Sequence, residues 1–312
     1  MLARRGFAGC VYNTPGSAKG KETQSMDDFD FESLSPTEPE PGPEPEPVNT
    51  TQLVNSACTK INAVTCGDAA KVLTTVDANS IDMVMTSPPY DTLRTYNGYT
   101  FAFEDIARQL YRVLKPGGVV IWVVGDATQN GSETGTSWKQ ALFFKALGFN
   151  IHDTMIYHKI NYVPLTHRRY EQSWEYMFCF SKGTPKTFTP LKVPCKTAGG
   201  RSGRFLQTPD AAAFSAAHTV KPTAEAKIAS NIFSYTIGAE KTGHPAVFPL
   251  ALATDQISSW TVPGNVVLDP FFGSGTTGVA CLQLGRNFIG VELSQEYCDI
   301  AILRLSKTIN VG

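Results

Sequence analysis

The sequence predicts an α/β fold in which a mostly parallel sheet carries helices on both faces. Short β-like runs alternate with amphipathic helical runs from about residue 60 onward, and this alternation is typical of parallel strands joined by crossover helices. The run at 119–126, whose first six residues are all apolar, indicates a strand that is buried on both faces. Two other β-like runs end abruptly in loops rich in proline or glycine, at 88–89 and at 273–278.

The expected elements follow one another in a regular order. The predicted strands cover 61–66, 81–86, 119–126, 151–159, 175–183, 265–273 and 287–293, with 175–183 as an antiparallel strand. The predicted helices cover 103–114, 137–148, 245–260, 276–285 and 296–307. The first helix should stop at the Lys-Pro-Gly-Gly sequence that follows it, and the second at Gly148.

Composition divides the chain into an arm, two patterned halves and an insertion. Residues 1–48 are rich in Pro and Glu, cannot pack a core, and are expected to be disordered. The alternating pattern covers 58–183 and 231–310, and the stretch 184–230 between them has little periodicity. A long irregular insertion in a compact domain is usually functional or disordered.

Several classes of protein do not fit the composition. No stretch approaches the ~18 apolar residues of a membrane span, so no membrane partner is expected. The seven cysteines are scattered and never form a CxxC pair, which favours reduced thiols inside a cell over disulfides or a zinc site. The five histidines also lack the spacing of metal ligands. We therefore expect no metal.

The net charge of −1 hides an asymmetry along the chain. Residues 26–47 hold eight acidic side chains and no basic one. Of the 27 basic and 28 acidic residues of the whole chain, residues 1–47 hold four and nine, which leaves a net charge of +4 for the rest. A mildly basic body fits a polyanionic partner such as DNA.

The strand at 81–86 ends in a proline-rich sequence, Ser87, Pro88, Pro89 and Tyr90. Proline cannot donate to a strand ladder, and it holds the residue before it extended. These residues should therefore form a rigid lip just beyond the strand. A plain strand-terminating turn, with the tyrosine packed on a neighbour, is the structural alternative.

A glycine-rich loop follows the strand at 265–273. Gly273, Gly275 and Gly278 match GxGxxG, and Glu292 lies nineteen residues after Gly273. Glycines let a ligand approach the backbone, the next helix offers free N–H groups, and a carboxylate at the next strand end can accept ribose hydroxyls. No lysine follows the loop, which excludes a phosphate-binding P-loop.

The residues around these glycines favour one cofactor over another. Asp269 would add a second acceptor, suited to an ammonium group, and Phe271 and Phe272 would supply an apolar wall. S-adenosylmethionine has a ribose, an ammonium and a carboxylate where NAD has a pyrophosphate. We therefore predict S-adenosylmethionine. An NAD site, or a glycine turn that binds nothing, are the alternatives.

With both motifs in hand, the chain resembles the DNA amino-methyltransferases, which methylate N4 of cytosine or N6 of adenine. The segments TSPPY (86–90), DPFFGSGTT (269–277), GVELSQEY (290–297) and HPAVFPLALATDQI (244–257) carry the resemblance, which covers about 58–308. The catalytic motif comes first and the cofactor motif last, as in the beta-type permutation of the family. The resemblance implies a Rossmann-like S-adenosylmethionine-dependent methyltransferase fold, circularly permuted, and a homodimer.

The resemblance also assigns roles to segments and residues. It makes 58–183 the catalytic half, 184–230 the inserted target-recognition segment and 231–310 the cofactor-binding half. It sets Asp68 against the adenine ring of the cofactor. The expected cofactor-binding residues are Asp68, His244, Pro245, Asp269, Pro270, Phe271, Phe272, Gly273, Ser274, Gly275, Thr276, Thr277 and Glu292.

The proline-rich lip suits methylation of an exocyclic amine, whose lone pair is delocalised into the ring. Two acceptors for the amino hydrogens, the Ser87 hydroxyl and the Pro88 carbonyl, would favour a tetrahedral nitrogen, and Pro89 would fix them. Tyr90 would stack on the base once it has left the duplex. In the family, Ser at the first motif position goes mostly with cytosine N4, and Asp or Asn with adenine N6. We therefore expect a cytosine-N4-specific DNA methyltransferase.

Other functions stay open at this point. The first alternative is N6-adenine methylation, and the second is a non-catalytic DNA-binding module. Methylation of RNA or of a protein glutamine usually accompanies Asn in place of Ser87. Cytosine C5 chemistry would need a cysteine nucleophile, and Cys195 lies far from any strand end near the cofactor motif. We interpret it as a plain thiol.

Basic side chains near the lip and in the insertion are candidates for phosphate contacts. The expected DNA-binding residues are Arg94, Arg168, Arg169, Lys186, Lys192, Lys196, Arg201 and Arg204. The protein should act inside the cell with DNA. An acidic low-complexity arm favours the nucleus of a eukaryote over the cytoplasm or nucleoid of a bacterium or phage.

Overall fold

The structure is a computed structural model that describes residues 61–89, 102–162, 169–196, 198, 224–238 and 248–309. The predicted arm at 1–48 lies outside the described residues. None of the helices in the described ranges is long and apolar enough to cross a membrane.

Eight strands form the central sheet in the order β1-β12-β11-β2-β3-β7-β6-β10. Their bounds, in that order, are Ala63–Cys66, Asn287–Glu292, Val266–Asp269, Ile81–Thr86, Leu114–Val124, Trp174–Ser181, Asn150–Lys159 and Ile232–Tyr235. All neighbouring pairs are parallel except the two that involve β7. The sheet is therefore mixed and mostly parallel, and the antiparallel strand is the one that the sequence indicates.

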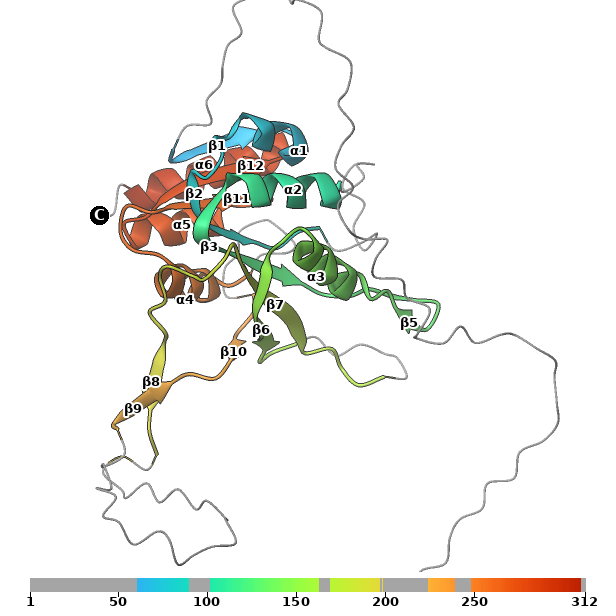
Figure 1. Ribbon diagram of the computed structural model, residues 1–312, viewed down its shortest axis with the longest axis vertical. Coiled ribbons are helices and arrows are strands. Elements are labelled where there is room, and N and C mark those ends of the chain that lie inside the picture. Colours follow the sequence, from blue (N-terminus) through green and yellow to red (C-terminus); the bar gives the residue numbers. More distant parts are fainter. Residues whose placement is uncertain are drawn as a thin grey trace, which may run out of the picture. The chain divides into compact units, whose positions relative to one another are not determined.

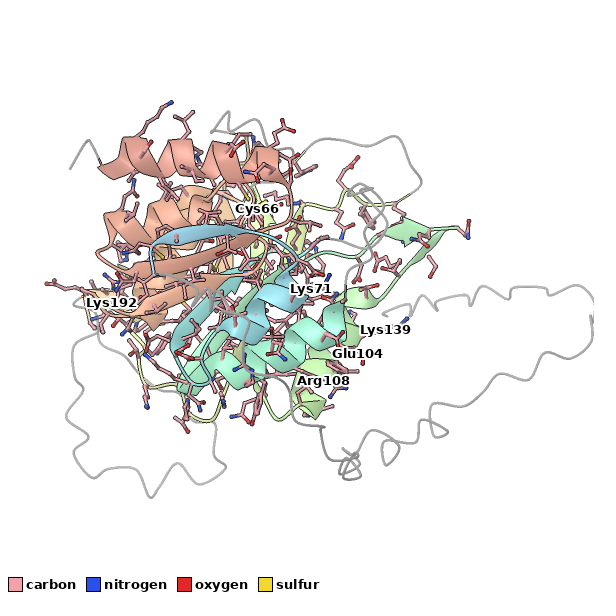
Figure 2. All side chains as sticks on the ribbon, turned by 90° about the horizontal axis from the view of Figure 1, so that it is seen from above. Cys66, Lys71, Glu104, Arg108, Lys139 and Lys192 are labelled. Atoms are coloured by element: carbon pink, nitrogen blue, oxygen red, sulfur yellow. The ribbon has the colours of Figure 1, made fainter. Side chains whose placement is uncertain are left out.

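Helices cover both faces of this sheet, as the alternating pattern predicts. One core cluster joins the sheet to α1 (Ala69–Val72), α2 (Phe103–Val113) and α3 (Thr136–Ala146). The other joins it to α4 (Leu250–Trp260), α5 (Thr276–Gln283) and α6 (Gln295–Ile309). The blue and green helices and the orange to red helices lie on opposite sides of the strands (Figures 1 and 2). A 3₁₀ turn, Leu73–Thr75, extends α1.

The strand β2 runs through the middle of the sheet, beside both β11 and β3. All of its residues except Asp82 are buried, as expected for a parallel strand with helices on both faces. Because parallel strands end at the same edge, the proline-rich lip after β2 lies beside the glycine-rich loop after β11. The fold thus brings the two sequence motifs together.

Two boundaries differ from the sequence prediction by five residues. The helix predicted at 245–260 begins at Leu250, after Pro249, because proline disfavours the helical conformation in the residue before it. Residues 245–247 lie outside the described ranges. The strand predicted at 119–126 begins already at Leu114 and includes the Lys-Pro-Gly-Gly sequence, with an irregular register between Ile81 and Met83 of its partner β2.

Short strands that the sequence did not predict form two further ribbons. β8 (Lys192–Pro194) pairs with β9 (Ala226–Ile228), so the insertion at 184–230 has an antiparallel base. β4 (Thr128–Gln129) and β5 (Ser132–Glu133) form a hairpin after β3. Its turn residues Asn130 and Gly131 have φ values of 50° and 81°, which is the signature of an Asn-Gly type I′ turn. Strands of two or three residues are too short to show a period in sequence.

Candidate active site

The candidate site lies at the edge of the sheet where the parallel strands end, here called the carboxyl edge. β1, β12, β11 and β2 bring Cys66, Glu292, Asp269 and Thr86 to this edge as their last residues. Binding sites of open α/β sheets lie at such an edge because the connecting loops diverge there. The opposite edge, where these strands begin, is called the amino edge.

Asp269 is buried inside the site and accepts three hydrogen bonds from neighbouring donors. Its Oδ1 accepts hydrogen bonds from the Thr86 hydroxyl at 2.6 Å and from the Phe271 N–H at 3.0 Å, and its Oδ2 accepts one from the Thr277 hydroxyl at 2.5 Å. Burial raises the pKa of Asp269 to about 6, against the effect of these three donors, and the charge of Glu292 adds to the rise. This carboxylate joins the end of β2 to the glycine-rich loop after β11, here called the cofactor loop.

Glu292 holds the same loop from the next strand. Its carboxylate accepts the Gly273 N–H at 2.8 Å and the Ser294 N–H at 2.9 Å. Each carboxylate oxygen can accept a second hydrogen bond, so Glu292 keeps acceptor capacity for a pair of ribose hydroxyls. Glu292 is therefore fixed by the backbone on both sides, in the place where the sequence expects the ribose acceptor.

The glycines of the loop serve two different purposes. Gly273 and Gly275 have φ values of 53° and 84°, a left-handed conformation that other residues adopt only with strain. A Cβ on Gly275 would lie 3.1 Å from the Cβ of Ala301 in α6, and one on Gly278 would lie 2.7 Å from the Phe272 ring. Gly275 and Gly278 therefore make room for protein side chains, whereas the sequence analysis assigned that room to a ligand.

The two phenylalanines of the motif differ in their burial and in the residues that they contact. Phe272 is 3% exposed, stacks on Phe288 with ring centroids 5.5 Å apart, and lies where a Cβ on Gly290 would approach it to 2.6 Å. Its ring fills the core beneath the loop, and its place in the predicted cofactor wall stays a prediction. Phe271 is half-buried, with its ring 6.3 Å from that of Trp122, and remains the candidate for that wall.

Arg304 of α6 clamps the loop from behind. Its guanidinium donates to the Ser274 carbonyl at 2.6 Å, to the Ser274 hydroxyl at 3.0 Å and to the Thr276 hydroxyl at 3.3 Å. Ser274, Thr276 and Thr277 are all nearly inaccessible, so their side chains stabilise the loop. Sequence reasoning missed the roles of both Arg304 and Thr86, because each acts through a contact with a residue that is distant in the sequence.

The proline-rich lip follows Thr86 directly. Ser87 and Pro89 are half-buried and Pro88 is buried. Thr86 stands opposite Trp122 in the register between β2 and β3, so the lip lies beside the end of β3 as well as beside the cofactor loop. Tyr90 and Arg94 lie outside the described residues.

Asp68 lies at the same edge, just after β1. It caps α1, with its Oδ1 accepting the Ala70 N–H at 3.0 Å, and it is exposed. The preceding Gly67 donates its N–H to the Glu292 carbonyl at 2.8 Å. Asp68 therefore stands next to the expected ribose acceptor. His244 and Pro245, the other predicted cofactor residues upstream of the loop, lie outside the described ranges.

The predicted DNA-binding residues do not gather in one place. Arg169 reaches the β4–β5 hairpin at the carboxyl edge, where it donates to the Gly131 carbonyl and lies 3.8 Å from the Glu133 carboxylate. Lys186 is at the amino edge, because its N–H donates to the Gly117 carbonyl near the start of β3. Arg168, Arg201 and Arg204 lie outside the described residues.

The basic segment that continues from Lys186 stays near the amino edge. Phe188 stacks on Trp260 at the end of α4, with ring centroids 4.6 Å apart, and β8 with the exposed Lys192 follows. Lys196 is exposed just beyond β8. Lys139 belongs to the first turns of α3, near the carboxyl edge. Lys192 lies on a different side of the domain from Lys139 (Figure 2). The structure therefore does not bring Lys186 or Lys192 to the lip.

No group of three or more His, Cys, Asp or Glu side chains in the described ranges could hold a metal ion. The described cysteines Cys66, Cys179, Cys195, Cys281 and Cys298 carry no disulfide among themselves. The site consists instead of oxygen acceptors and backbone donors on a fixed loop. It can hold a neutral or cationic nucleoside-type cofactor beside a rigid lip. This arrangement fits a group transfer in which the protein holds the two reactants in the correct positions.

Comparison with known proteins supports this interpretation. The family of N6/N4 DNA methylases matches residues 81–303. The orphan methyltransferase M.BamHII of Bacillus amyloliquefaciens is 47% identical over 241 residues, which cover 74% of this chain and 90% of the relative. The type II methyltransferase M.SmaI of Serratia marcescens is 28% identical over 283 residues, covering 77% of this chain and 89% of the relative.

Two solved structures share the fold. The crystal structure of M1.HpyAVI in complex with S-adenosylmethionine is 27% identical, with a TM-score of 0.53, and covers 78% of this chain and 99% of the other. The cytosine-N4-specific PvuII DNA methyltransferase is 20% identical with a TM-score of 0.59, covers 82% of this chain and 93% of the other, and shows the likeness of fold. These findings confirm the predicted fold class. The chain belongs to the N6/N4 DNA methylase family, whose methyl donor is S-adenosylmethionine.

Proposed function

We propose that this chain transfers a methyl group from S-adenosylmethionine to N4 of cytosine in DNA. Membership in the family gives DNA methylation, and the choice of cytosine N4 goes beyond it. The observation that carries the proposal is the hydrogen bond of 2.6 Å between the Thr86 hydroxyl and Asp269. This bond fixes the lip that begins at Ser87 relative to the loop that would hold the cofactor.

The residues of the site fit the cofactor. Glu292 would accept the ribose hydroxyls, Asp68 would lie toward the adenine ring, and Phe271 would flank it. Asp269 accepts hydrogen bonds from three donors of the protein itself, so we assign it to positioning of the loop and not to direct contact with the ammonium group. When bound, S-adenosylmethionine supplies an electrophilic methyl group on a sulfonium.

The lip would position the amine for direct attack. The Ser87 hydroxyl and the Pro88 carbonyl accept the two amino hydrogens and direct the nitrogen lone pair toward the methyl group, while Pro89 keeps both acceptors in place. Holding two reactants in line can supply several kcal/mol of the barrier, on the order of 7 to 11 in the best cases. No covalent intermediate with the protein is needed. Ser at position 87 supports cytosine N4 over adenine N6. Arg169, which lies at the carboxyl edge, would contact a phosphate.

Nucleoside mass spectrometry tests the proposal. Duplex DNA would be incubated with the protein and methyl-labelled S-adenosylmethionine, then digested to nucleosides. Label in N4-methylcytosine is the expected result. Label in N6-methyladenine alone would overturn the assignment of the base and keep the fold and cofactor.

Calorimetric titration with S-adenosylmethionine separates an enzyme from a non-catalytic DNA-binding module. Binding is expected, and its absence would leave only the module. The homodimer expected from the resemblance stays a prediction. The relatives M.BamHII and M.SmaI come from bacteria, so they give no support to the nuclear localisation favoured by the acidic arm.

A further inference from the structure

An ion pair between Lys159 and Glu175 lies at the carboxyl edge, apart from the lip and the cofactor loop. The ammonium of Lys159, at the end of β6, contacts Glu175 near the start of β7. Only 22% and 13% of the two side chains are exposed. An ion pair with this little exposure adds little to stability, because desolvation of both charges offsets their attraction. Its presence therefore calls for another explanation.

The antiparallel direction of β7 brings this pair to the same edge as the lip. Thr86 is opposite Trp122, and Val124 of the same strand is opposite Tyr176. The residue before Tyr176 is Glu175, whose Cγ would lie 3.5 Å from a Cβ on Gly125, just past the end of β3. The Lys159–Glu175 pair therefore begins one strand beyond β3, with the lip on the other side of β3.

The lip and the ion pair also share a face of the sheet. Met83, Met85 and Met177 belong to the core cluster on the α4 face, and side chains alternate along a strand. Ser87 is held extended by the proline after it, so it continues the series of Met83 and Met85. Glu175 continues the series of Met177 in the same way. Two strand spacings, about 10 Å, separate β2 from β7.

Within the described ranges, only atoms of Glu175 would lie within 4 Å of a Cβ on Gly125, the residue between these two polar groups. Gly125 lies just past the end of the intervening strand β3, follows Val123 on this face, and has no side chain to fill the space. A base extruded from a duplex is read by hydrogen bonds to its Watson–Crick edge. A slot over Gly125, with Ser87 on one side and Lys159 on the other, has the polarity for such an edge.

The order of donors and acceptors in this slot distinguishes the two bases of the family. Cytosine presents its N4 amine, then the acceptor N3, then the acceptor O2. Adenine presents its N6 amine, then the acceptor N1, then a C–H group. An ammonium group carries only donors, so a lysine at the third position matches cytosine and leaves adenine unpaired.

We propose that Lys159, oriented by Glu175, donates a hydrogen bond to O2 of the extruded cytosine while the N4 amine faces Ser87 and Pro88. Lys159 is the specificity-determining residue and Glu175 is its positioning residue. This inference rests on the proposed function. Tyr157, directly opposite Glu175 in the strand register, borders the pair; burial, with a further contribution from the Glu175 charge, raises the pKa of its hydroxyl, so it stays neutral.

Three variants test the proposal in the full-length protein. Lys159→Met removes the donor with little change in volume, Glu175→Gln keeps an acceptor for Lys159 without the charge, and Lys159→Met/Glu175→Gln avoids a buried unpaired carboxylate. The matched control is Lys115→Met, which breaks the Lys115–Asp82 ion pair of 2.8 Å at the amino edge of the same sheet. Each variant is assayed on unmethylated duplex DNA for N4-methylcytosine and N6-methyladenine, with kcat and KM for DNA measured separately.

Lys159→Met and the double variant should lose roughly 10- to 100-fold in kcat/KM for cytosine, as expected for a lost charged hydrogen bond. The share of N6-methyladenine in the product should rise, and affinity for S-adenosylmethionine should be unchanged. The double variant should be no worse than Lys159→Met, because Glu175 acts through Lys159. Lys115→Met should keep the wild-type product ratio.

Two results would overturn the inference, and they are distinguishable. If the wild-type protein forms N4-methylcytosine and the double variant does so at the same rate and ratio, Lys159 does not read the base. If the wild-type protein forms N6-methyladenine alone, the proposed function fails first, and the role of Lys159 fails with it.

Discussion

Two aspartates join the neighbouring strands β2 and β11, one at each edge of the sheet, and they do different work. At the amino edge, Asp82 of β2 accepts the Val266 N–H at 2.9 Å and pairs with Lys115 at 2.8 Å. At the carboxyl edge, Asp269 of β11 accepts the Thr86 hydroxyl at 2.6 Å. Asp82 thus holds the starts of the two strands together, and Asp269 holds their ends together.

The two contacts differ in the segments into which their residues lead along the chain. Lys115 and Val266 lead into strands, so a small shift at the amino edge is absorbed by the sheet. Thr86 leads into the lip at Ser87, and Asp269 leads into the cofactor loop, so a small shift there changes the distance between two reacting groups. We therefore expect the same residue type to be structural at one edge and functional at the other, although both carboxylates accept hydrogen bonds across the same two strands.

Exchanging each aspartate for asparagine tests this difference between the two edges and should give the largest effect. Asp269→Asn replaces an acceptor by an NH₂ group that faces a hydroxyl donor, and we expect turnover to fall on the order of 100-fold, as small misplacements of reacting groups do. Asp82→Asn should lower the free energy of unfolding by about 1–3 kcal/mol and leave kcat near the wild-type value. Steady-state kinetics and urea unfolding of both variants measure this. Equal losses of kcat would show that the two edges do not differ.

The titration of Asp269 gives the same comparison a pH dependence. Burial raises its pKa from 3.8 to about 6. As the pH falls, the carboxylate is therefore protonated at a higher pH in the folded protein than in the unfolded chain. This group's contribution to stability is therefore fully present below pH 3.8 and is lost as pH rises through about 6. The free energy of unfolding of the wild-type protein should therefore rise as the pH is lowered from 7 to 5. The rise should be smaller in Asp269→Asn, and an identical rise in both proteins would contradict the assignment.

Ser87→Ala should lower kcat by roughly 10- to 100-fold, because one of the two acceptors for the amine is lost and a positioned group of this kind contributes about that much. Affinity for S-adenosylmethionine, measured by calorimetry, should be unchanged. Single-turnover rates separate the chemical step from product release. A variant with the wild-type single-turnover rate would remove Ser87 from the mechanism.

Local pattern predicted the elements that build the edge but not the contacts that join them. The strand predicted at 81–86 is β2, and the antiparallel strand and both helix-covered faces were also predicted. Thr86 and Asp269 are 183 positions apart, and Arg304 reaches Ser274 across 30. A period of two or of 3.6 residues carries no information about such pairs, so neither could be predicted from one sequence.

The glycine-rich loop shows a second limit of sequence reasoning. The pattern of Gly273, Gly275 and Gly278 predicted close approach to the backbone, and close approach is what the structure has. The approaching groups at both Gly275 and Gly278 are the Phe272 ring and a side chain of α6. A glycine indicates that space is needed, whereas the identity of the group that fills the space depends on tertiary packing.

Gly278→Ala tests whether Gly278 makes room for packing of the core or for binding of the cofactor. The added Cβ would lie 2.7 Å from the Phe272 ring and 2.9 Å from Leu305, so we expect the free energy of unfolding to fall by about 1–3 kcal/mol, as overpacked cores do. Calorimetry on the folded variant should show near-normal affinity for S-adenosylmethionine. Phe272→Leu in the same background should recover part of the stability. Lost affinity with unchanged stability would return Gly278 to the cofactor site.

Ser181→Ala provides the smallest effect and the matched control for Ser87→Ala. Ser181 ends β7 at the amino edge, is completely buried, and has no hydrogen-bond partner for its hydroxyl within the described part of the chain. A buried hydroxyl without a partner costs stability, so its removal should raise the free energy of unfolding by about 1 kcal/mol. Urea unfolding measures this change. Turnover should stay at the wild-type level, because Ser181 lies across the sheet from the lip. The same substitution would then stabilise the protein at one edge and impair methyl transfer at the other, and a loss of turnover in Ser181→Ala would show that the two edges are coupled.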